Sequence, residues 1–203
     1  MEFFFDFISP YAYFASTQID ALAKRYGREV QWKPVLIGVT VMQVMGLKPL
    51  METPLKSDYV AHDKPRMARL LGIPFVEHGI RGVNSVAASR AFLAIARSDE
   101  ALAQRFARAV FERLWVRGMD ITAPADVGEV CAQVGADAAG VLAEIASPAG
   151  KQALRDAVDQ AVARGVFGTP YFFVDGEPIW GVDRLWMVEH WLIHGNWDPA
   201  APR

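Results

Sequence analysis

Segments with the composition of β-strands occur only near the two ends of this 203-residue chain, and no other feature restricts its fold as strongly. Residues 2–8 form a short run rich in Phe, and residues 30–36 form a second apolar run. Short aromatic and β-branched runs predict buried strands. Between them, residues 10–26 carry apolar side chains at helical spacing before Gly27, a common helix stop. The chain therefore opens with a β-α-β unit.

Strand signals return only at the other end of the chain. Residues 171–174 and 177–180 flank Asp175-Gly176, a dipeptide that favours the two-residue turn of a β-hairpin. A last helix is expected over residues 183–194. The order β-α-β, several helices, then β-β-α predicts an α/β protein of thioredoxin-like fold, with a large all-helical insertion between its two halves.

The same order predicts the domain organisation. Residues 1–37 and 166–203 form a discontinuous thioredoxin-like domain, and residues 38–165 form a helical insertion domain. Apolar residues recur at helical spacing throughout the insertion. The helices expected there lie within 57–71, where Pro65 indicates a kink or a late start, from an N-cap at Asn84 to about 95, and over 102–114, 124–135, 138–145 and 148–165.

Charge and hydropathy exclude several kinds of partner. The 21 Lys and Arg residues are balanced by 23 Asp and Glu residues, so no positive field favours nucleic acid or an anionic membrane. No apolar stretch reaches about eighteen residues, and the first Phe-rich run is interrupted by Asp6 and followed by Pro10. That run also lacks the basic start of a secretory signal. We therefore expect a cytoplasmic protein with no nucleic-acid or membrane partner.

The sulfur and imidazole groups do not form a redox or metal motif. Cys131 is the only cysteine, so neither an internal disulfide nor a C-x-x-C pair is available, and its helical surroundings indicate a small buried hydrophobe. His190 and His194 have the spacing of two metal ligands on one helix face, but no third ligand accompanies them. We expect no metal site.

Ser9 stands at the junction of the first strand and the first helix. In thioredoxin-like oxidoreductases this junction holds the attacking cysteine, whereas here Ser9-Pro10 is also a typical helix start. Lowering a thiol pKa by about two units requires roughly 2.7 kcal/mol. A hydrogen bond to a charged acceptor supplies about 1.5–3 kcal/mol and a helix end about 0.3–1 kcal/mol. Ser9 is thus either a helix cap or the group that activates a ligand's thiolate.

Two further segments are candidates for binding such a ligand. Thr169-Pro170 directly precedes the third strand, where a cis-proline in thioredoxin-like folds leaves the preceding backbone free to pair with a cysteinyl peptide; the alternative is a plain turn proline. Asp183 begins the last predicted helix. It is either the N-cap of that helix or, with Arg184, the receptor of a γ-glutamyl group that carries both an ammonium and a carboxylate.

These motifs together resemble the 2-hydroxychromene-2-carboxylate isomerases and the related kappa-class glutathione transferases. The resemblance covers nearly the whole chain. It implies a DsbA-like thioredoxin fold, glutathione as cofactor and a homodimer. The segments that carry it are Phe-Asp-Phe-Ile-Ser-Pro-Tyr at 5–11, Gly-Leu-Lys-Pro at 46–49, Pro-Leu-Lys at 54–56, Leu-Gly-Ile-Pro at 71–74, Gly165 to Pro170, and Trp-Gly-Val-Asp-Arg-Leu at 180–185.

The resemblance also implies how the cysteinyl part of glutathione is bound. Ser9 hydrogen-bonds and activates the thiolate, as the catalytic group, and Pro10 and Tyr11 complete the same helix end. Thr169, which precedes a cis-Pro170, binds the cysteinyl backbone.

The two ends of the tripeptide have their own candidates. By the same resemblance, Val182 and Asp183 receive the γ-glutamyl group with the help of Arg184, and Lys56 meets the glycyl carboxylate. Leu47 departs from the pattern, because kappa-class enzymes have a glutathione-contacting asparagine there. That contact is therefore absent or made by the backbone, which implies weaker binding of glutathione.

The implied reaction interconverts 2-hydroxychromene-2-carboxylate and trans-o-hydroxybenzylidenepyruvate, a cis-trans isomerisation in the breakdown of naphthalene-type aromatics. The thiolate adds reversibly to a conjugated double bond, so glutathione is not consumed. The substrate is a small aromatic molecule, for which Tyr11, Tyr13 and some of the Trp side chains are candidate contacts. Two alternatives stay open: a kappa-like transferase or peroxidase that consumes glutathione, and a redox-inert thioredoxin-like module that binds peptides.

Overall fold

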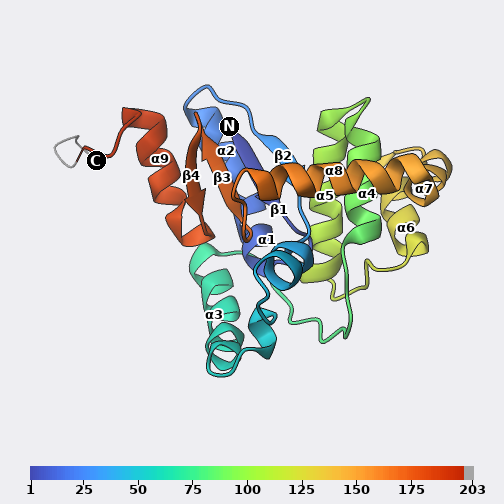
Figure 1. Ribbon diagram of the computed structural model, residues 1–203, viewed down its shortest axis with the longest axis horizontal. Coiled ribbons are helices and arrows are strands. Elements are labelled where there is room, and N and C mark those ends of the chain that lie inside the picture. The colour runs from blue at the N-terminus through green and yellow to red at the C-terminus, as the bar shows by residue number, and fades with distance from the viewer. Residues whose placement is uncertain (199–203) are drawn as a thin grey trace.

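The computed structural model describes residues 1–198, and its centre is one four-stranded sheet (Figure 1). The strands are β1 (Glu2–Phe5), β2 (Gln31–Pro34), β3 (Tyr171–Val174) and β4 (Glu177–Trp180), in the spatial order β2-β1-β3-β4. β1 and β2 are parallel, while β1–β3 and β3–β4 are antiparallel. This topology confirms the thioredoxin-like prediction, although the first two strands are shorter than expected. Residues 199–203 of the second predicted half lie outside the described residues.

Both faces of the sheet are covered, which explains why β1 reads as a nearly continuous apolar run. Phe3 lies opposite Trp32 and Phe172 in the register, and its ring packs 5.0 Å from Trp32 and 5.5 Å from Phe172 between centroids. Phe4 points to the other face and joins a separate apolar cluster with Leu154 and other residues of α8 (Pro148–Ala163). Side chains that alternate along the strand therefore enter two different cores.

Helices form the rest of the molecule. Besides α8, they are α1 (Pro10–Ser16), α2 (Ile19–Arg25), the π-helical segment η1 (Gly38–Val44), the 3-10 turn η2 (Leu50–Glu52), α3 (Lys56–Leu71), α4 (Val86–Ala96), α5 (Glu100–Trp115), α6 (Pro124–Val134), α7 (Ala138–Ala146), the 3-10 turn η3 (Val182–Arg184) and α9 (Leu185–His194). In Figure 1, α4 to α7 gather on one side of the sheet, α9 lies on the opposite side, and α3 extends below.

Two details of the predicted helices are wrong, and one alternative that the sequence left open is resolved. The helix expected over residues 10–26 is two helices. The Thr17 hydroxyl and the side-chain amide of Gln18 both donate to the Phe14 carbonyl, at 2.8 and 3.1 Å, and so compete with the backbone hydrogen bonds that would continue α1. Asn84 is not the N-cap of α4; Ser85 holds that position, and the Asn84 side chain accepts from the Val86 amide. The helix with Pro65 inside starts at Lys56, so a late start is excluded.

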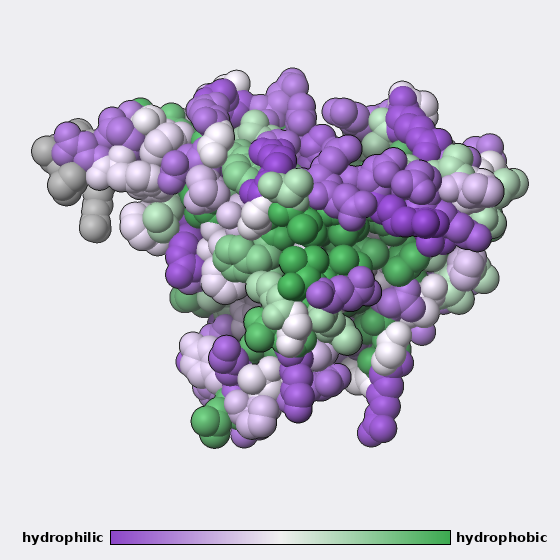
Figure 2. Space-filling model, in the orientation of Figure 1, coloured by the Kyte–Doolittle hydropathy of each residue, from purple (hydrophilic) through white to green (hydrophobic). Residues whose placement is uncertain are grey.

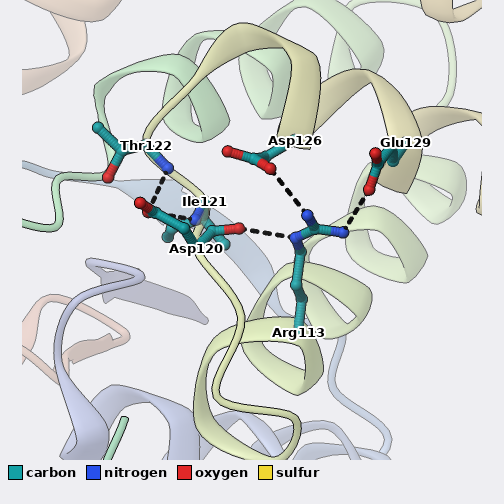
Figure 3. A network of polar contacts seen from close by, with 6 residues as sticks. All are labelled: Arg113, Asp120, Ile121, Thr122, Asp126 and Glu129. Atoms are coloured by element: carbon teal, nitrogen blue, oxygen red, sulfur yellow. Dashed lines mark hydrogen bonds and ion pairs between the residues drawn. The ribbon is translucent and has the colours of Figure 1, made fainter. Parts of the chain in front are cut away.

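Ion pairs fix the helices of the insertion to one another. Arg113 projects from α5 between Asp126 and Glu129 of α6, with N–O distances of 2.9 and 2.8 Å, and its Nε donates to the Asp120 carbonyl (Figure 3). The Asp120 carboxylate accepts from the next two backbone amides and so closes the connecting loop. The Arg113 and Asp126 side chains are 12% and 26% exposed, so their ion pair is less screened by water than a surface pair, whereas Glu129 is 67% exposed.

The larger apolar cluster crosses the predicted boundary at residues 37 and 38. It begins with Phe3 and Phe5 of β1 and continues into Phe92 of α4 and Phe111 of α5. Cys131 lies in the same cluster, fully buried as predicted, and burial raises the pKa of its thiol to about 11. The division into two domains stays a prediction. No helix within residues 1–198 is both long and apolar enough to cross a membrane.

Candidate functional site

Ser9 caps α1, as one of the two sequence interpretations predicted. Its backbone is extended (φ −95°, ψ 113°), and its Oγ accepts a hydrogen bond from the Ala12 amide at 3.2 Å. Pro10 is the first helical residue and has no N–H to satisfy. Tyr13 N–H bonds to the Ser9 carbonyl in the ordinary helical way. Within the described residues, the backbone N–H of Tyr11 is the donor of this first turn that lacks a partner.

The hydroxyl of Ser9 also reaches the loop before β3. It donates to the Thr169 carbonyl at 3.2 Å, across 160 residues of sequence, and the Thr169-Pro170 peptide bond is cis, as predicted. Ser9 is only 4% exposed. Thr169 has two polar groups without partners among residues 1–198: its backbone N–H and its buried Oγ1. The structure thus brings together the two residues on which the sequence interpretation depends.

The segment around Asp183 lies beside the same loop. The Gly181 amide donates to the Pro170 carbonyl at 3.0 Å, and the turn η3 packs against α1. The prediction that Asp183 caps the last helix is wrong, because η3 intervenes and α9 begins at Leu185 without a side-chain cap. The Asp183 carboxylate is exposed, with Arg184 at 3.5 Å, while Arg184 also donates to the Trp180 carbonyl. Val182, by contrast, is buried.

Lys56 is the first residue of α3, and its connection to the site is indirect. The Tyr11 hydroxyl of α1 donates to Asp63 Oδ2 at 2.6 Å, and Asp63 in turn accepts from Arg66. Burial and the Asp63 hydrogen bond raise the pKa of Tyr11. α3 is therefore tied to α1 two residues beyond Ser9. Lys56 itself is exposed and forms no hydrogen bond or ion pair within the described part of the chain.

The residue that accepts the Ser9 amide carries a buried carboxylate, which the sequence analysis did not identify. Asp6 is 1% exposed and accepts from the amides of Ile8 and Ile37, at 3.2 and 2.8 Å, and from the Ser85 hydroxyl. Burial raises its pKa to about 6, although these hydrogen bonds oppose the shift. Its backbone carbonyl accepts from the Ser9 amide at 3.0 Å. An acidic residue inside an apolar run was the only signal in the sequence.

Several other sequence candidates lie apart from Ser9. Leu47 is 56% exposed, and its backbone N–H is already bonded to the Val41 carbonyl. Tyr13 lines a cavity of about 660 Å³ between α1, α5 and residues 72–74, but none of the nine predicted glutathione contacts lines it. Trp32 and Trp115 are core residues, whereas Trp180, Trp186 and Trp197 are at least 40% exposed.

Large hydrophobic side chains are exposed in the segment that joins β2 to α3. Figure 2 shows hydrophobic residues gathered at the centre of the viewed face, below the hydrophilic band over α8. The large hydrophobic residues that are exposed in the segment between β2 and α3 are Met42, Val44, Met45, Leu47, Leu50, Met51 and Leu55. His190 and His194 have ring centroids 4.4 Å apart, and residues 1–198 contain no group of three or more His, Cys, Asp or Glu that could hold a metal ion.

Comparison with known proteins identifies the family. The family model of the DsbA-like thioredoxin domain matches residues 1–192. A 2-hydroxychromene-2-carboxylate isomerase of Sphingobium xenophagum is 32% identical over 197 residues, which cover 95% of this chain and 97% of that protein. The chain belongs to the DsbA-like thioredoxin family. Its relatives place it among the 2-hydroxychromene-2-carboxylate isomerases and kappa-class glutathione transferases within that family.

Two further relatives agree with this placement of the DsbA-like chain. Glutathione S-transferase kappa 1 of Homo sapiens is 28% identical, in an alignment that covers 100% of this chain and 94% of that protein. A solved structure of a 2-hydroxychromene-2-carboxylate isomerase superposes with a TM-score of 0.82 at 28% identity, covering 93% of this chain and 92% of that one. The family resemblance predicted from the sequence motifs is therefore confirmed.

Proposed function

We propose that this protein is a glutathione-dependent isomerase that interconverts 2-hydroxychromene-2-carboxylate and trans-o-hydroxybenzylidenepyruvate, in the breakdown of naphthalene-type aromatics. The observation that carries the proposal is the contact between the Ser9 hydroxyl and the Thr169 carbonyl, because it joins a helix-capping serine to the backbone that precedes cis-Pro170. Three relatives named as 2-hydroxychromene-2-carboxylate isomerases align with this chain over most of their length, and they support the reaction type.

The hydrogen-bonding groups of the site fit the cysteinyl part of glutathione. The Tyr11 N–H and the Ser9 hydroxyl lie at one helix end and are donors for an anion. The Thr169 N–H and carbonyl can pair with a peptide in the manner of an added strand. When bound, glutathione supplies a thiolate that adds reversibly to a conjugated double bond and so allows rotation about it.

Binding requires the Ser9 hydroxyl to change its acceptor. The hydroxyl hydrogen is now directed to the Thr169 carbonyl. Rotation about the Cβ–Oγ bond would let the Ser9 hydroxyl donate to a bound thiolate, and the Thr169 carbonyl would then be free to accept the cysteinyl amide of glutathione. The Ala12 amide continues to donate to Ser9 Oγ and holds the oxygen in place. One hydroxyl thus satisfies the carbonyl before binding and the anion afterwards.

The hydrogen bond from Ser9 supplies the larger share of the proposed thiolate stabilisation. α1 has only seven residues, about two turns, because Thr17 and Gln18 end it early. A hydrogen bond to a charged acceptor contributes about 1.5–3 kcal/mol, whereas an exposed helix end contributes about 0.3–1 kcal/mol. Loss of the hydroxyl should therefore remove most of the effect.

The remaining predicted residues fit the two charged ends of the tripeptide. The Asp183 carboxylate is not used as a cap and is exposed, so it can receive the γ-glutamyl ammonium, with Arg184 for the carboxylate. Lys56 has no acidic partner within residues 1–198 and is available for the glycyl carboxylate. The exposed rings of Phe167 and Trp180 lie 4.9 Å apart beside the loop that precedes β3, and they offer a surface to an aromatic substrate.

The test of the reaction is a mass balance. Purified protein is incubated with 2-hydroxychromene-2-carboxylate and glutathione, and both product and free thiol are measured over time. We expect product without loss of thiol. A loss of thiol equal to the product formed would instead indicate the kappa-like transferase. No binding of millimolar glutathione in calorimetry would favour the peptide-binding module. The proposal also includes a cytoplasmic homodimer, and light scattering of the purified protein measures its mass.

Ser9→Ala tests the role of the hydroxyl. We expect the rate to fall by about 10-fold to 100-fold, because a hydrogen bond of about 1.5–3 kcal/mol to the thiolate is lost. Ser16→Ala is the matched control, since Ser16 lies in the same helix and its hydroxyl bonds only to the local Tyr13 carbonyl. Full activity of Ser9→Ala would remove Ser9 from the chemistry.

A further inference from the structure

A second hydroxyl holds the loop that ends in Thr169. Thr40 Oγ1 lies 3.2 Å from the Phe167 carbonyl, across 127 residues of sequence, and 3.3 Å from the nearby Ile37 carbonyl. The side chain is almost completely buried, at 2% exposure. Because Phe167 is two residues before Thr169, this bond and the bond from Ser9 hold the same short loop at two points.

Thr40 lies in an unusual piece of backbone. It belongs to the π-helical segment η1, in which the Met45 amide bonds to the Thr40 carbonyl five residues earlier. π-helical turns are rare and occur frequently at functional sites. The Thr40 hydroxyl lies between the Phe167 carbonyl of the loop before β3 and the Ile37 carbonyl of its own segment.

The hydrogen bonds around this loop form a closed circuit. The Ser9 amide donates to the Asp6 carbonyl, and the Asp6 carboxylate accepts from the Ile37 amide at the start of η1. From η1, Thr40 reaches the Phe167 carbonyl. The chain then runs through Gly168 to Thr169, whose carbonyl accepts from Ser9. Both sides of the site are thus tied to the same buried residue, Asp6, one through its backbone carbonyl and the other through its carboxylate.

The middle of the loop is restricted as well. A Cβ at Gly168 would lie 3.0 Å from Trp180 Nε1, so the indole ring packs closely against this glycine. The loop is therefore held at Phe167 by Thr40, at Gly168 by Trp180 and at Thr169 by Ser9. When the Ser9 hydroxyl turns away to a ligand, the bond from Thr40 to the Phe167 carbonyl still holds the chain before Thr169, and the bond from the Gly181 amide to the Pro170 carbonyl holds it after Thr169.

We propose that Thr40 is a positioning residue, which fixes the Thr169 backbone opposite Ser9 through its bond to the Phe167 carbonyl and thereby sets the affinity for a cysteinyl peptide. This inference rests on the proposed function, because it takes glutathione as the peptide. Thr40 does not touch the ligand, and its effect is on binding more than on the reaction at the sulfur.

The test compares glutathione binding by Thr40→Val and Thr40→Ser. Valine keeps the branched shape and removes the donor, so we expect the Kd from calorimetry to rise about five- to tenfold, and KM to change more than kcat. Serine keeps the donor and should remain within about twofold of the original protein. Thr17→Val is the matched control, because it removes a hydroxyl-to-carbonyl bond at the far end of α1.

A crystal structure of Thr40→Val supplies a readout besides activity, since the distance from Ser9 Oγ to the Thr169 carbonyl should lengthen. If Thr40→Val does not fold, Thr40→Ala removes the same donor with less bulk and should show the same loss of affinity. Unchanged affinity in a folded variant that lacks the hydroxyl would overturn the inference. Absence of glutathione binding by the unaltered protein would overturn the proposed function itself.

Discussion

At the scale of single residues, Ser9 stands where thioredoxin-like oxidoreductases have the attacking cysteine, and its side chain forms hydrogen bonds instead. Ser9 Oγ accepts from the Ala12 amide and donates to the Thr169 carbonyl, so both of its capacities are used in the structure. A cysteine in this position would be a poor acceptor and a weak donor. The two interpretations that the sequence left open, helix cap and ligand contact, are therefore compatible in one side chain.

Asp6 gives a prediction about pH. Its pKa is raised from 3.8 to about 6 in the folded protein, so between about pH 4 and pH 6 the folded state binds more protons than the unfolded state. Stability must then fall as the pH rises through this window, by at most about 3 kcal/mol. Asp6→Asn has no carboxyl group to titrate at this position, so its stability should not show this fall between about pH 4 and pH 6.

The measurement is urea unfolding of both proteins at several pH values. Asp6→Asn has a fixed penalty, because its amide nitrogen meets the Ser85 hydroxyl or the donating amides of Ile8 and Ile37. The difference between the two proteins should therefore shrink as the pH rises. A difference that stays constant with pH would show that Asp6 does not titrate in this window.

Residues that stand at a recognisable helix start or strand start could be predicted, and residues that no such local pattern marks could not. Ser9 and Pro170 were identified because a helix start and a strand start are visible in the adjacent sequence. Besides its local contact with Ile8, Asp6 has partners 31 and 79 positions away, at Ile37 and Ser85. Besides its local contact with Ile37, Thr40 has a partner 127 positions away, at Phe167. No local pattern contains such pairs, so only the folded chain shows them.

At the scale of elements, the hairpin turn agrees with the sequence prediction, whereas the start of the last helix does not. Asp175 and Gly176 both have positive φ, 53° and 92°, as the predicted tight turn requires. The last helix, however, begins after a 3-10 turn instead of at Asp183. The cause is Gly181, whose φ of 104° lets the chain turn back toward Pro170 before the helix can start.

Gly181→Ala therefore tests the γ-glutamyl end of the site. A Cβ at this position would lie 2.4 Å from Asp183 Oδ1, so the carboxylate must move, and the backbone is strained as well. We expect glutathione affinity to fall about tenfold or more, since one charge-assisted bond of about 1.5–3 kcal/mol is displaced. Calorimetry with glutathione measures the change.

Gly195→Ala is the control for backbone strain. Its φ is 65°, and a Cβ there meets no atom within 4 Å. Gly195→Ala should lose about 1 kcal/mol of stability, because its backbone is in the left-handed helical region, and Gly181→Ala should lose more, because a Cβ there also meets Asp183; thermal unfolding measures both losses. Only Gly181→Ala should weaken binding. Equal binding by the two variants would mean that Asp183 has no part in recognition.

At the scale of the whole molecule, the order of elements was sufficient for the fold, but it left the packing between the halves open. The helical insertion does not pack only on itself. Phe111 of α5 contacts the rings of Phe5 and Phe7, and the Trp115 indole donates to the Phe7 carbonyl at 2.8 Å. Such contacts join segments far apart in sequence, and hydrophobic periodicity alone does not specify them.

This shared core predicts that the chain unfolds in one step, although its sequence divides into a discontinuous domain and an insertion. Circular dichroism follows mainly the insertion helices, and hydrogen exchange follows the β1 and β3 amides; both should give the same unfolding free energy.

Phe111→Ala should lower the unfolding free energy from both measurements by about 3–5 kcal/mol, because a fully buried ring is removed from the joint cluster. Trp186→Ala, at a 61% exposed position, is the control and should change both little. Separate transitions, with only the helical signal responding to Phe111→Ala, would show instead that residues 38–165 are an independent domain, and the position of Ser9 would then not depend on them.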